Sequence, residues 1–177
     1  MQTLRTRRLE LVPATLALVE AELESSGALA MRLGAVVPGC WPPGEYDRAA
    51  LEFFRERLAR DPAAAGWYSW YAIHRPTDSD DAVLVGAGGF FGPPGADGIA
   101  EVGYSIVPEF RSRGFASELI QALVSHALAK PEVLRVIAHT APANLASIRV
   151  LERSGFRLAG TDDETGMIRY ASTKKND

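Results

Sequence analysis

The stretch Pro108-Glu109-Phe110-Arg111-Ser112-Arg113-Gly114-Phe115-Ala116-Ser117 lies between a predicted strand and the strongest predicted helix of the chain. The N-terminus of a helix exposes unpaired backbone N–H groups and the positive end of the helix dipole. Gly114 and the small Ala116 would let this backbone approach an anion closely, while Arg111 and Arg113 add positive charge at the rim. The stretch therefore predicts a pyrophosphate site, although a plain helix start with two solvated arginines also fits it.

The segments on either side of this turn predict a parallel pair of strands. Residues 99–107 have a strand pattern, and residues 133–140 have the pattern of a buried strand. Between them, the apolar residues of 114–129 fall on one helical stripe, which consists of Leu119, Ile120, Leu123, Val124, Ala127 and Leu128. A strand–helix–strand unit over 99–140 requires a parallel pair with a right-handed crossover.

The rest of the chain predicts an antiparallel meander before this unit and a short closing unit after it. The further expected elements are strands at 4–12, 67–74, 82–91, 156–160 and 167–172, helices from Pro13 to about Gly27, at 46–60 and at 144–153, a loop at 34–45 and a polar turn at 76–81. We therefore expect a mixed α/β sheet, antiparallel early and parallel at its centre, flanked by helices. The length of 177 residues fits one domain, 1–177.

The composition is that of a globular protein and excludes several classes. The net charge of −3 argues against nucleic acid as the main ligand. Cys40 is the only cysteine, so neither an intrachain disulfide nor a thiolate metal cluster can form. The acidic and histidine residues show no metal-ligand spacing, so we expect no metal. Signal-peptide and membrane-spanning patterns are lacking too, so we expect a cytoplasmic protein without a membrane partner.

Two common phosphate-binding motifs do not fit the turn at 108–117. A Walker A loop needs a lysine and a Ser or Thr after its second glycine, and the chain has no such run. The dinucleotide-binding pattern needs three spaced glycines, and only Gly114 is present here.

The turn resembles a third motif. Arg111-x-x-Gly114-x-Ala116, after a strand and before a long helix, is similar to the acetyl-CoA signature of the GNAT superfamily of N-acetyltransferases. Asn144-Leu145-Ala146-Ser147 followed by Gly155-Phe156 is similar to a second segment of that superfamily. The opening residues 4–11 and the Trp41-Pro42-Pro43 loop resemble the branch of ribosomal-protein N-terminal (Rim-type) acetyltransferases. The resemblance spans nearly the whole chain.

This resemblance implies acetyl-CoA as co-substrate and assigns cofactor-binding residues. The main chain of Ser105, Ile106 and Val107 would pair with the pantetheine arm, and one of these N–H groups would stabilise the oxyanion. The pyrophosphate would lie on the turn formed by Arg111, Arg113, Gly114, Phe115, Ala116 and Ser117. Asn144 would contact the pantetheine arm, although capping of the following helix alone could explain Asn144 and Ser147.

The resemblance also implies catalytic residues. Glu101 would be the general base, with an edge-exposed glutamate as the alternative. Many relatives place a tyrosine acid seven residues after the asparagine, but Leu151 stands there, so Ser147 becomes the candidate proton donor. Tyr104 would line the acceptor pocket or simply pack, and His139 fits a packed residue better than a base. The aromatic cluster at 67–71 and 90–91 would build core and pocket wall.

The implied reaction is direct attack of a primary amine on the thioester in a ternary complex. An α-amine with a pKa of about 7.7–8.0 is roughly a tenth to a sixth neutral at pH 7, whereas a lysine amine is neutral about once in 2,500. Protein N-termini or small amines are therefore favoured as acceptors over lysine side chains. A homodimer is a further expectation. The alternatives are an inactive acyl-CoA-binding regulatory module, transfer of another acyl group, and an unrelated anion-binding α/β domain.

Overall fold

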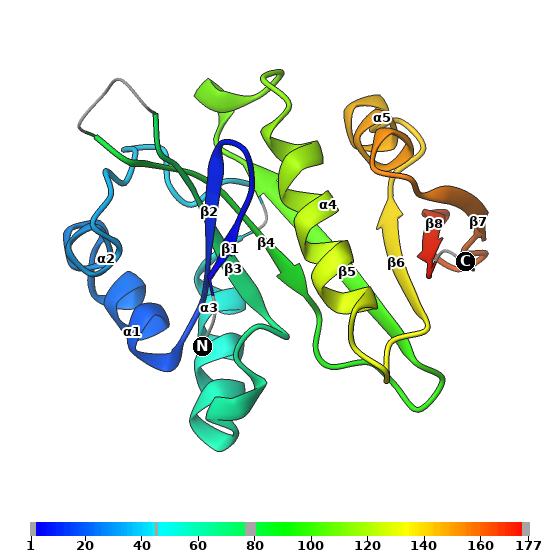
Figure 1. The fold of residues 1–177 in the computed structure, drawn as a ribbon, viewed down its shortest axis with the longest axis horizontal. Helices are drawn as coiled ribbons and strands as arrows, with labels where there is room; N and C mark the ends of the chain where they lie inside the picture. Colours follow the sequence, from blue (N-terminus) through cyan, green and yellow to red (C-terminus); the bar gives the residue numbers. More distant parts are fainter. Residues whose placement is uncertain (1–2, 45, 77–80, 175–177) are drawn as a thin grey trace.

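The computed structural model describes residues 3–44, 46–76 and 81–174, and their strands form one twisted mixed sheet (Figure 1). The strand order is β1-β2-β3-β4-β5-β6-β8-β7. The strands are β1 (Leu4–Arg5), β2 (Leu9–Pro13), β3 (Ser69–His74), β4 (Val83–Phe90), β5 (Ile99–Ile106), β6 (Arg135–Thr140), β7 (Arg157–Thr161) and β8 (Ile168–Thr173). The helices are α1 (Leu16–Glu24), α2 (Ser26–Leu33), α3 (Arg48–Arg60), α4 (Phe115–Leu128) and α5 (Leu145–Arg153), with short 3₁₀ turns η1 (Pro62–Ala64) and η2 (Pro108–Phe110).

The expected fold class is confirmed. Strands β1 to β5 pair antiparallel in chain order, and β5 pairs parallel with β6 after the α4 crossover. Strand β8 lies between β6 and β7 and is antiparallel to both. In the polar turn expected at 76–81, residues 77–80 lie outside the described residues.

Helices cover both faces of the sheet and bury two apolar clusters. Helices α4 and α5 pack on one face, where Leu119, Leu123 and Leu151 are fully buried. Helices α1, α2 and α3 cover the other face, against Tyr71 and Ile73 of β3. In Figure 1, α4 crosses in front of the central strands, and its N-terminus and that of α5 lie toward the same end of these strands. Truncating a fully buried leucine costs about 2–5 kcal/mol, so these clusters hold the two helix starts in place.

The structure corrects the sequence interpretation near the N-terminus. The strand expected at 4–12 is a hairpin, because the N–H of Thr6 donates to the carbonyl of Leu9 at 2.9 Å and reverses the chain. The helix expected to dissolve near Gly27 is two helices instead. Ser25 ends α1 and begins α2, where its Oγ accepts from the N–H of Ala28 at 3.1 Å. Gly27 therefore lies inside α2.

The parallel pair at the centre of the sheet is short and then opens. Only three residues of β5 are paired with β6, and the last pair is Glu101 with Ile137. Beyond this point β5 continues to Ile106 beside β4 alone. The two strands therefore form a fork, and the α4 and α5 N-termini follow its two arms along the chain.

No helix of the described part of the chain is long and apolar enough to cross a membrane.

Candidate active site

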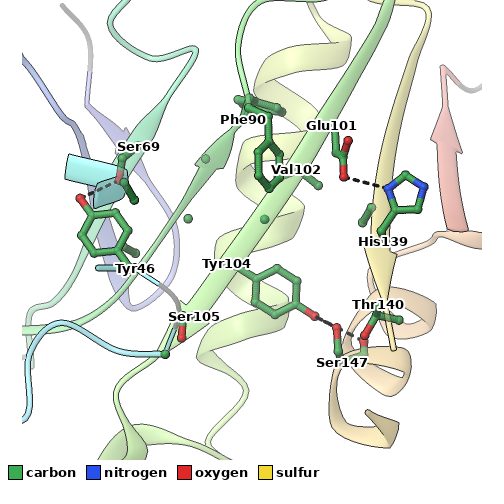
Figure 2. A pocket seen from close by; sticks show the side chains of 18 of the residues that line it. Tyr46, Ser69, Phe90, Glu101, Val102, Tyr104, Ser105, His139, Thr140 and Ser147 are labelled. Carbon is green, nitrogen blue, oxygen red and sulfur yellow. Dashed lines mark hydrogen bonds and ion pairs between the residues drawn. The ribbon is translucent and has the colours of Figure 1, made fainter. Parts of the chain in front are cut away.

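A cavity of about 600 Å³ occupies the fork between β5 and β6 (Figure 2). Its walls come from β4, β5, the end of β6, the start of α5, helix α3 and the loop before α3. Four of the residues that line it are predicted site residues: Glu101 and Ser105 on β5, Ser147 on α5, and Asn144 at the N-cap of α5. The fold thus brings the expected catalytic residues and part of the expected cofactor strand to one cavity.

On one side, the main chain of β5 forms hydrogen bonds with β4. On the other side, after Glu101, it has no neighbouring strand among the described residues. The carbonyl of Glu101 accepts from the N–H of Phe91 at 3.0 Å, and the N–H of Val107 donates to Val85 at 2.9 Å. Main-chain groups alternate between the two sides of a strand. Odd-numbered residues of β5 therefore face β4, and even-numbered residues face the fork.

This alternation separates the three residues that were expected to hold the pantetheine arm through their main chain. Ile106 turns its N–H and C=O toward the fork, and the Nε of Arg111 donates to that carbonyl at 2.9 Å. Ser105 and Val107 turn their main-chain groups toward β4 instead. The Ser105 side chain lies in the cavity beside Gly44, where a Cβ on Gly44 would come within 2.8 Å of its Oγ.

The turn before α4 has the backbone of an anion nest. Ser112 and Gly114 both adopt left-handed conformations, with φ of 60° and 82°. Helix α4 begins at Phe115, so the N–H groups of Phe115, Ala116 and Ser117 precede its first hydrogen-bonded turn. A negative group at this point would meet these N–H groups and the helix dipole. Phe115 itself is buried, so only its main chain can serve such a ligand.

The N-terminal hairpin braces this turn through Glu118, a contact that the sequence analysis missed. Glu118 accepts from Thr6 Oγ1 at 2.5 Å and from Arg8 Nε at 2.8 Å. Arg8 also donates to the carbonyl of Arg113 at 2.9 Å, and its guanidinium lies over the Phe115 ring. Burial raises the pKa of Glu118, but these hydrogen bonds outweigh it and lower the pKa overall. Arg8 and Glu118 are 110 residues apart in the chain, so no local sequence pattern could have predicted their contact.

Helix α5 and strand β5 each present one hydroxyl to the fork. The Oδ1 of Asn144 caps the helix by accepting from the N–H of Ser147 at 3.1 Å. The Ser147 Oγ lies 3.0 Å from the hydroxyl of Tyr104, which reaches across from β5 (Figure 2). Burial raises the pKa of Tyr104, so the phenol keeps its proton at neutral pH. Leu151, which stands where many relatives have a tyrosine, is fully buried.

Glu101 and His139 face each other on neighbouring strands at the closed end of the fork (Figure 2). The His139 Nδ1 lies 2.8 Å from the Glu101 Oε1. The His139 side chain is 24% exposed and the Glu101 side chain is 36% exposed, so both can reach a ligand in the cavity. The sequence analysis singled out both residues, but not their contact.

An aromatic wall closes the side of the cavity away from Glu101. Tyr46, Phe54 and Tyr68 form this wall, with ring centroids 6.1 Å apart for Tyr46 and Phe54 and 6.0 Å apart for Phe54 and Tyr68. Of the aromatic cluster expected as core and pocket wall, Tyr68, Phe90 and Phe91 line the cavity, whereas Trp70 is buried in the core under α4. The sequence analysis did not predict a role for Tyr46.

A partly buried carboxylate lies behind this wall. Glu22 accepts from Trp41 Nε1 at 2.6 Å, from the Tyr71 hydroxyl at 2.6 Å and from the Tyr46 hydroxyl at 3.3 Å. Burial raises the pKa of Glu22 despite these hydrogen bonds. Helix α1, the loop before α3 and strand β3 are thereby tied together around the wall.

The described residues include no group of three or more His, Cys, Asp or Glu side chains placed to hold a metal ion.

The site thus combines a splayed parallel pair, a helix N-terminus with the backbone of an anion nest, and a cavity lined by a carboxylate and hydroxyls. Residues 8–157 match the sequence model of the acetyltransferase (GNAT) domain family, and the chain belongs to this family. The chain is 31% identical over 158 residues to YjdG, an uncharacterized N-acetyltransferase of Bacillus subtilis (strain 168), with 89% of this chain and 91% of YjdG covered.

Solved structures share the fold. A GNAT-family acetyltransferase from Bacillus anthracis superposes with a TM-score of 0.64 at 22% identity, covering 99% of this chain and 100% of that chain. RimL, a ribosomal-protein alpha-N-protein acetyltransferase in complex with coenzyme A, superposes with a TM-score of 0.67 at 18% identity, covering 99% and 100%. The protein is therefore an acetyl-CoA-dependent N-acetyltransferase.

Proposed function

We propose that this enzyme acetylates the α-amine of a protein or peptide N-terminus, or a small primary amine, in the manner of the Rim-type branch. The observation that carries the proposal is the fork itself, where Glu101 and Tyr104 from β5 and Ser147 from α5 line one cavity. Likeness of fold to RimL supports the branch. The reaction is direct attack in a ternary complex, because Cys40, the only cysteine, is exposed outside the cavity-lining residues.

Glu101 is the proposed general base. Its carboxylate lines the cavity and accepts a proton from the attacking amine, directly or through a water molecule. The neighbouring His139 holds the carboxylate in place through the 2.8 Å contact. An α-amine with a pKa near 8 is neutral far more often than a lysine amine at pH 7, so this acceptor needs less help from a base.

Ser147 is the proposed proton donor to the departing thiolate. Tyr104 keeps its proton and can donate it to the Ser147 Oγ at 3.0 Å, which leaves the serine proton free to point into the cavity. Tyr104 is then a positioning residue for Ser147. This arrangement replaces the tyrosine acid of many relatives, for which Leu151 offers no equivalent.

The residues around the fork suit coenzyme A. Ile106 would pair with the pantetheine arm through its main chain, with Asn144 beside it, while Ser105 contributes its side chain and Val107 shapes the strand. The pyrophosphate would lie on the nest of Ser112 to Ser117, with Arg111 and Arg113 at its rim. When bound, the thioester supplies the acetyl group.

Calorimetric titration of coenzyme A and acetyl-CoA tests the nest. Gly114→Glu fills the cradle and adds a negative charge, so we expect micromolar binding to weaken at least tenfold. Gly166→Glu is the matched control, because Gly166 also has positive φ (68°) and has open space around its Cα. Equal affinity in both variants would contradict the nest, and binding without thiol release for any amine would identify an inactive acyl-CoA-binding module instead.

A further inference from the structure

The cavity is poor in positive charge. Among the described residues that line it, only Glu101 and His139 carry side chains that can be charged at neutral pH, apart from phenols, and no arginine or lysine is present. The other polar groups are hydroxyls, main-chain groups and the Asn144 amide. A ligand group with a negative charge would therefore find no cationic partner among these residues.

The ionisable side chains around this lining are two carboxyl groups and one guanidinium. Glu22 lies behind Tyr46, and Asp162 lies close enough to His139 for their charges to interact. The pKa of Asp162 is lowered mainly by hydrogen bonds from Thr165 and to a smaller degree by His139. Arg169 pairs with His139 in the β6–β8 ladder, but its guanidinium donates to the carbonyl of Ala159.

The rings of the aromatic wall offer apolar surface to the cavity. The hydroxyl of Tyr46 accepts from Ser69 at 3.2 Å and donates to Glu22, so this hydroxyl already has partners within the protein. Figure 2 shows Tyr46 and Ser69 on one side of the cavity and the Glu101–His139 pair on the other. At the rim, Phe91 lies against Gly103, with its side chain 66% exposed. An amine held at Glu101 would thus have aromatic rings available for the group that it carries.

We propose that the acceptor is a primary amine on an uncharged, apolar or aromatic body, with an amide rather than a carboxylate or phosphate near the amine. This inference rests on the proposed function and names its substrate class. A carboxylate beside the amine would lose water without gaining a partner and would face Glu101. An apolar group would bury its surface against the wall formed by Tyr46, Phe54 and Tyr68. For a peptide, the rule applies to its first residue.

Three C-terminally amidated tripeptides test this rule, X-Ala-Ala-amide with X as Phe, Asn or Asp. Their α-amines have similar basicity, and Asn and Asp have nearly the same shape, so the Asn-to-Asp comparison isolates the charge. We expect kcat/KM for acetylation to fall about tenfold from Asn to Asp and at least about 100-fold from Phe to Asp. Equal rates with the Asn and Asp peptides would overturn the inference while leaving the acetyltransferase assignment intact.

Two variants and one further amine complete the experiment. Phe91→Lys brings a cation to the rim and should raise the Asp-to-Asn ratio about tenfold. Leu158→Lys is the control, since Leu158 is 63% exposed on β7 and outside the cavity-lining residues, and its ratio should stay at the wild-type value. If 2-phenylethylamine is acetylated and none of the three tripeptides is, the inference is supported. The same result would overturn the proposal that the acceptor is a peptide or protein N-terminus. If none of these amines is acetylated, both the inference and the proposed acceptor class are wrong.

Discussion

Glu101 is the last residue of β5 that pairs with β6, and its carboxylate contacts His139 from the neighbouring strand. The parallel pairing of β5 with β6 ends at Glu101, the residue that makes this side-chain contact. The candidate base therefore sits at the closed end of the fork, fixed by strand pairing on one side and by an imidazole on the other. A residue held in this way needs little reorganisation before it accepts a proton.

Glu101→Gln tests the base. We expect kcat/KM with a peptide acceptor to fall about 100-fold at pH 7, within the usual range for loss of a general base. The deficit should shrink toward pH 9, because an α-amine with a pKa near 8 is then mostly neutral without help. Calorimetry should give wild-type affinity for coenzyme A. His139→Gln, which removes only the positioning contact, should cost about tenfold, and full activity in Glu101→Gln would exclude the assigned role.

Ser147→Ala and Tyr104→Phe test the hydroxyl pair as a double-mutant cycle. Loss of the proton donor should lower kcat for thiol release about 10- to 100-fold. Loss of the Tyr104 hydroxyl removes one hydrogen bond, which is worth about 1 kcal/mol or roughly fivefold in rate. If Tyr104 acts through Ser147, the double variant should be no slower than Ser147→Ala alone. A larger loss in Tyr104→Phe than in Ser147→Ala would make the tyrosine the donor.

Glu118→Gln tests the brace between the N-terminal hairpin and α4. Breaking the hydrogen bonds from Thr6 and Arg8 should destabilise the protein by about 1–3 kcal/mol. Because its folded pKa is lowered, Glu118 stabilises the wild type above its unfolded pKa, and this contribution disappears as pH falls through the folded pKa. The difference between wild type and variant in urea unfolding should therefore vanish in acid.

The matched control for this brace is Glu109→Gln, an exposed glutamate in the same connection between β5 and α4. It should unfold like the wild type at every pH. Coenzyme A binding should weaken in Glu118→Gln and stay unchanged in Glu109→Gln, since Arg8 also holds the Arg113 carbonyl of the nest. Wild-type stability in Glu118→Gln would show that the brace contributes nothing.

Glu22→Gln tests the partly buried carboxylate behind the aromatic wall, and its pH dependence has the opposite sign. The folded pKa is raised by burial, so the glutamate's contribution is most favourable below its unfolded pKa and is lost as pH rises through the folded pKa. The unfolding free energy of the variant relative to the wild type should therefore increase as the pH rises above about 4, the ordinary pKa of a glutamate. Parallel pH profiles for the two proteins would contradict a raised pKa.

Several features of the site could be predicted from local sequence because they depend on short spacings. Gly114 and the residues around it form the nest within one turn, and the helical stripe after it sets which face of α4 is buried. Asn144 and Ser147 are three residues apart, which is the spacing of a helix cap, and they form one. The strand–helix–strand order similarly required the parallel pair of β5 and β6.

The contacts that make the site specific join residues far apart in the chain. Tyr104 and Ser147 are 43 residues apart, Glu101 and His139 are 38 apart, and Arg8 and Glu118 are 110 apart. Such pairs depend on strand register and on which helix covers which face, and a shift of one residue in a strand would turn its side chains to the opposite face. The sequence by itself determined the central strand–helix–strand unit, the turn before α4 and the family pattern. Only the packing of the two layers on the sheet decided which polar side chains meet in the fork, because no local spacing encodes a contact between separate elements.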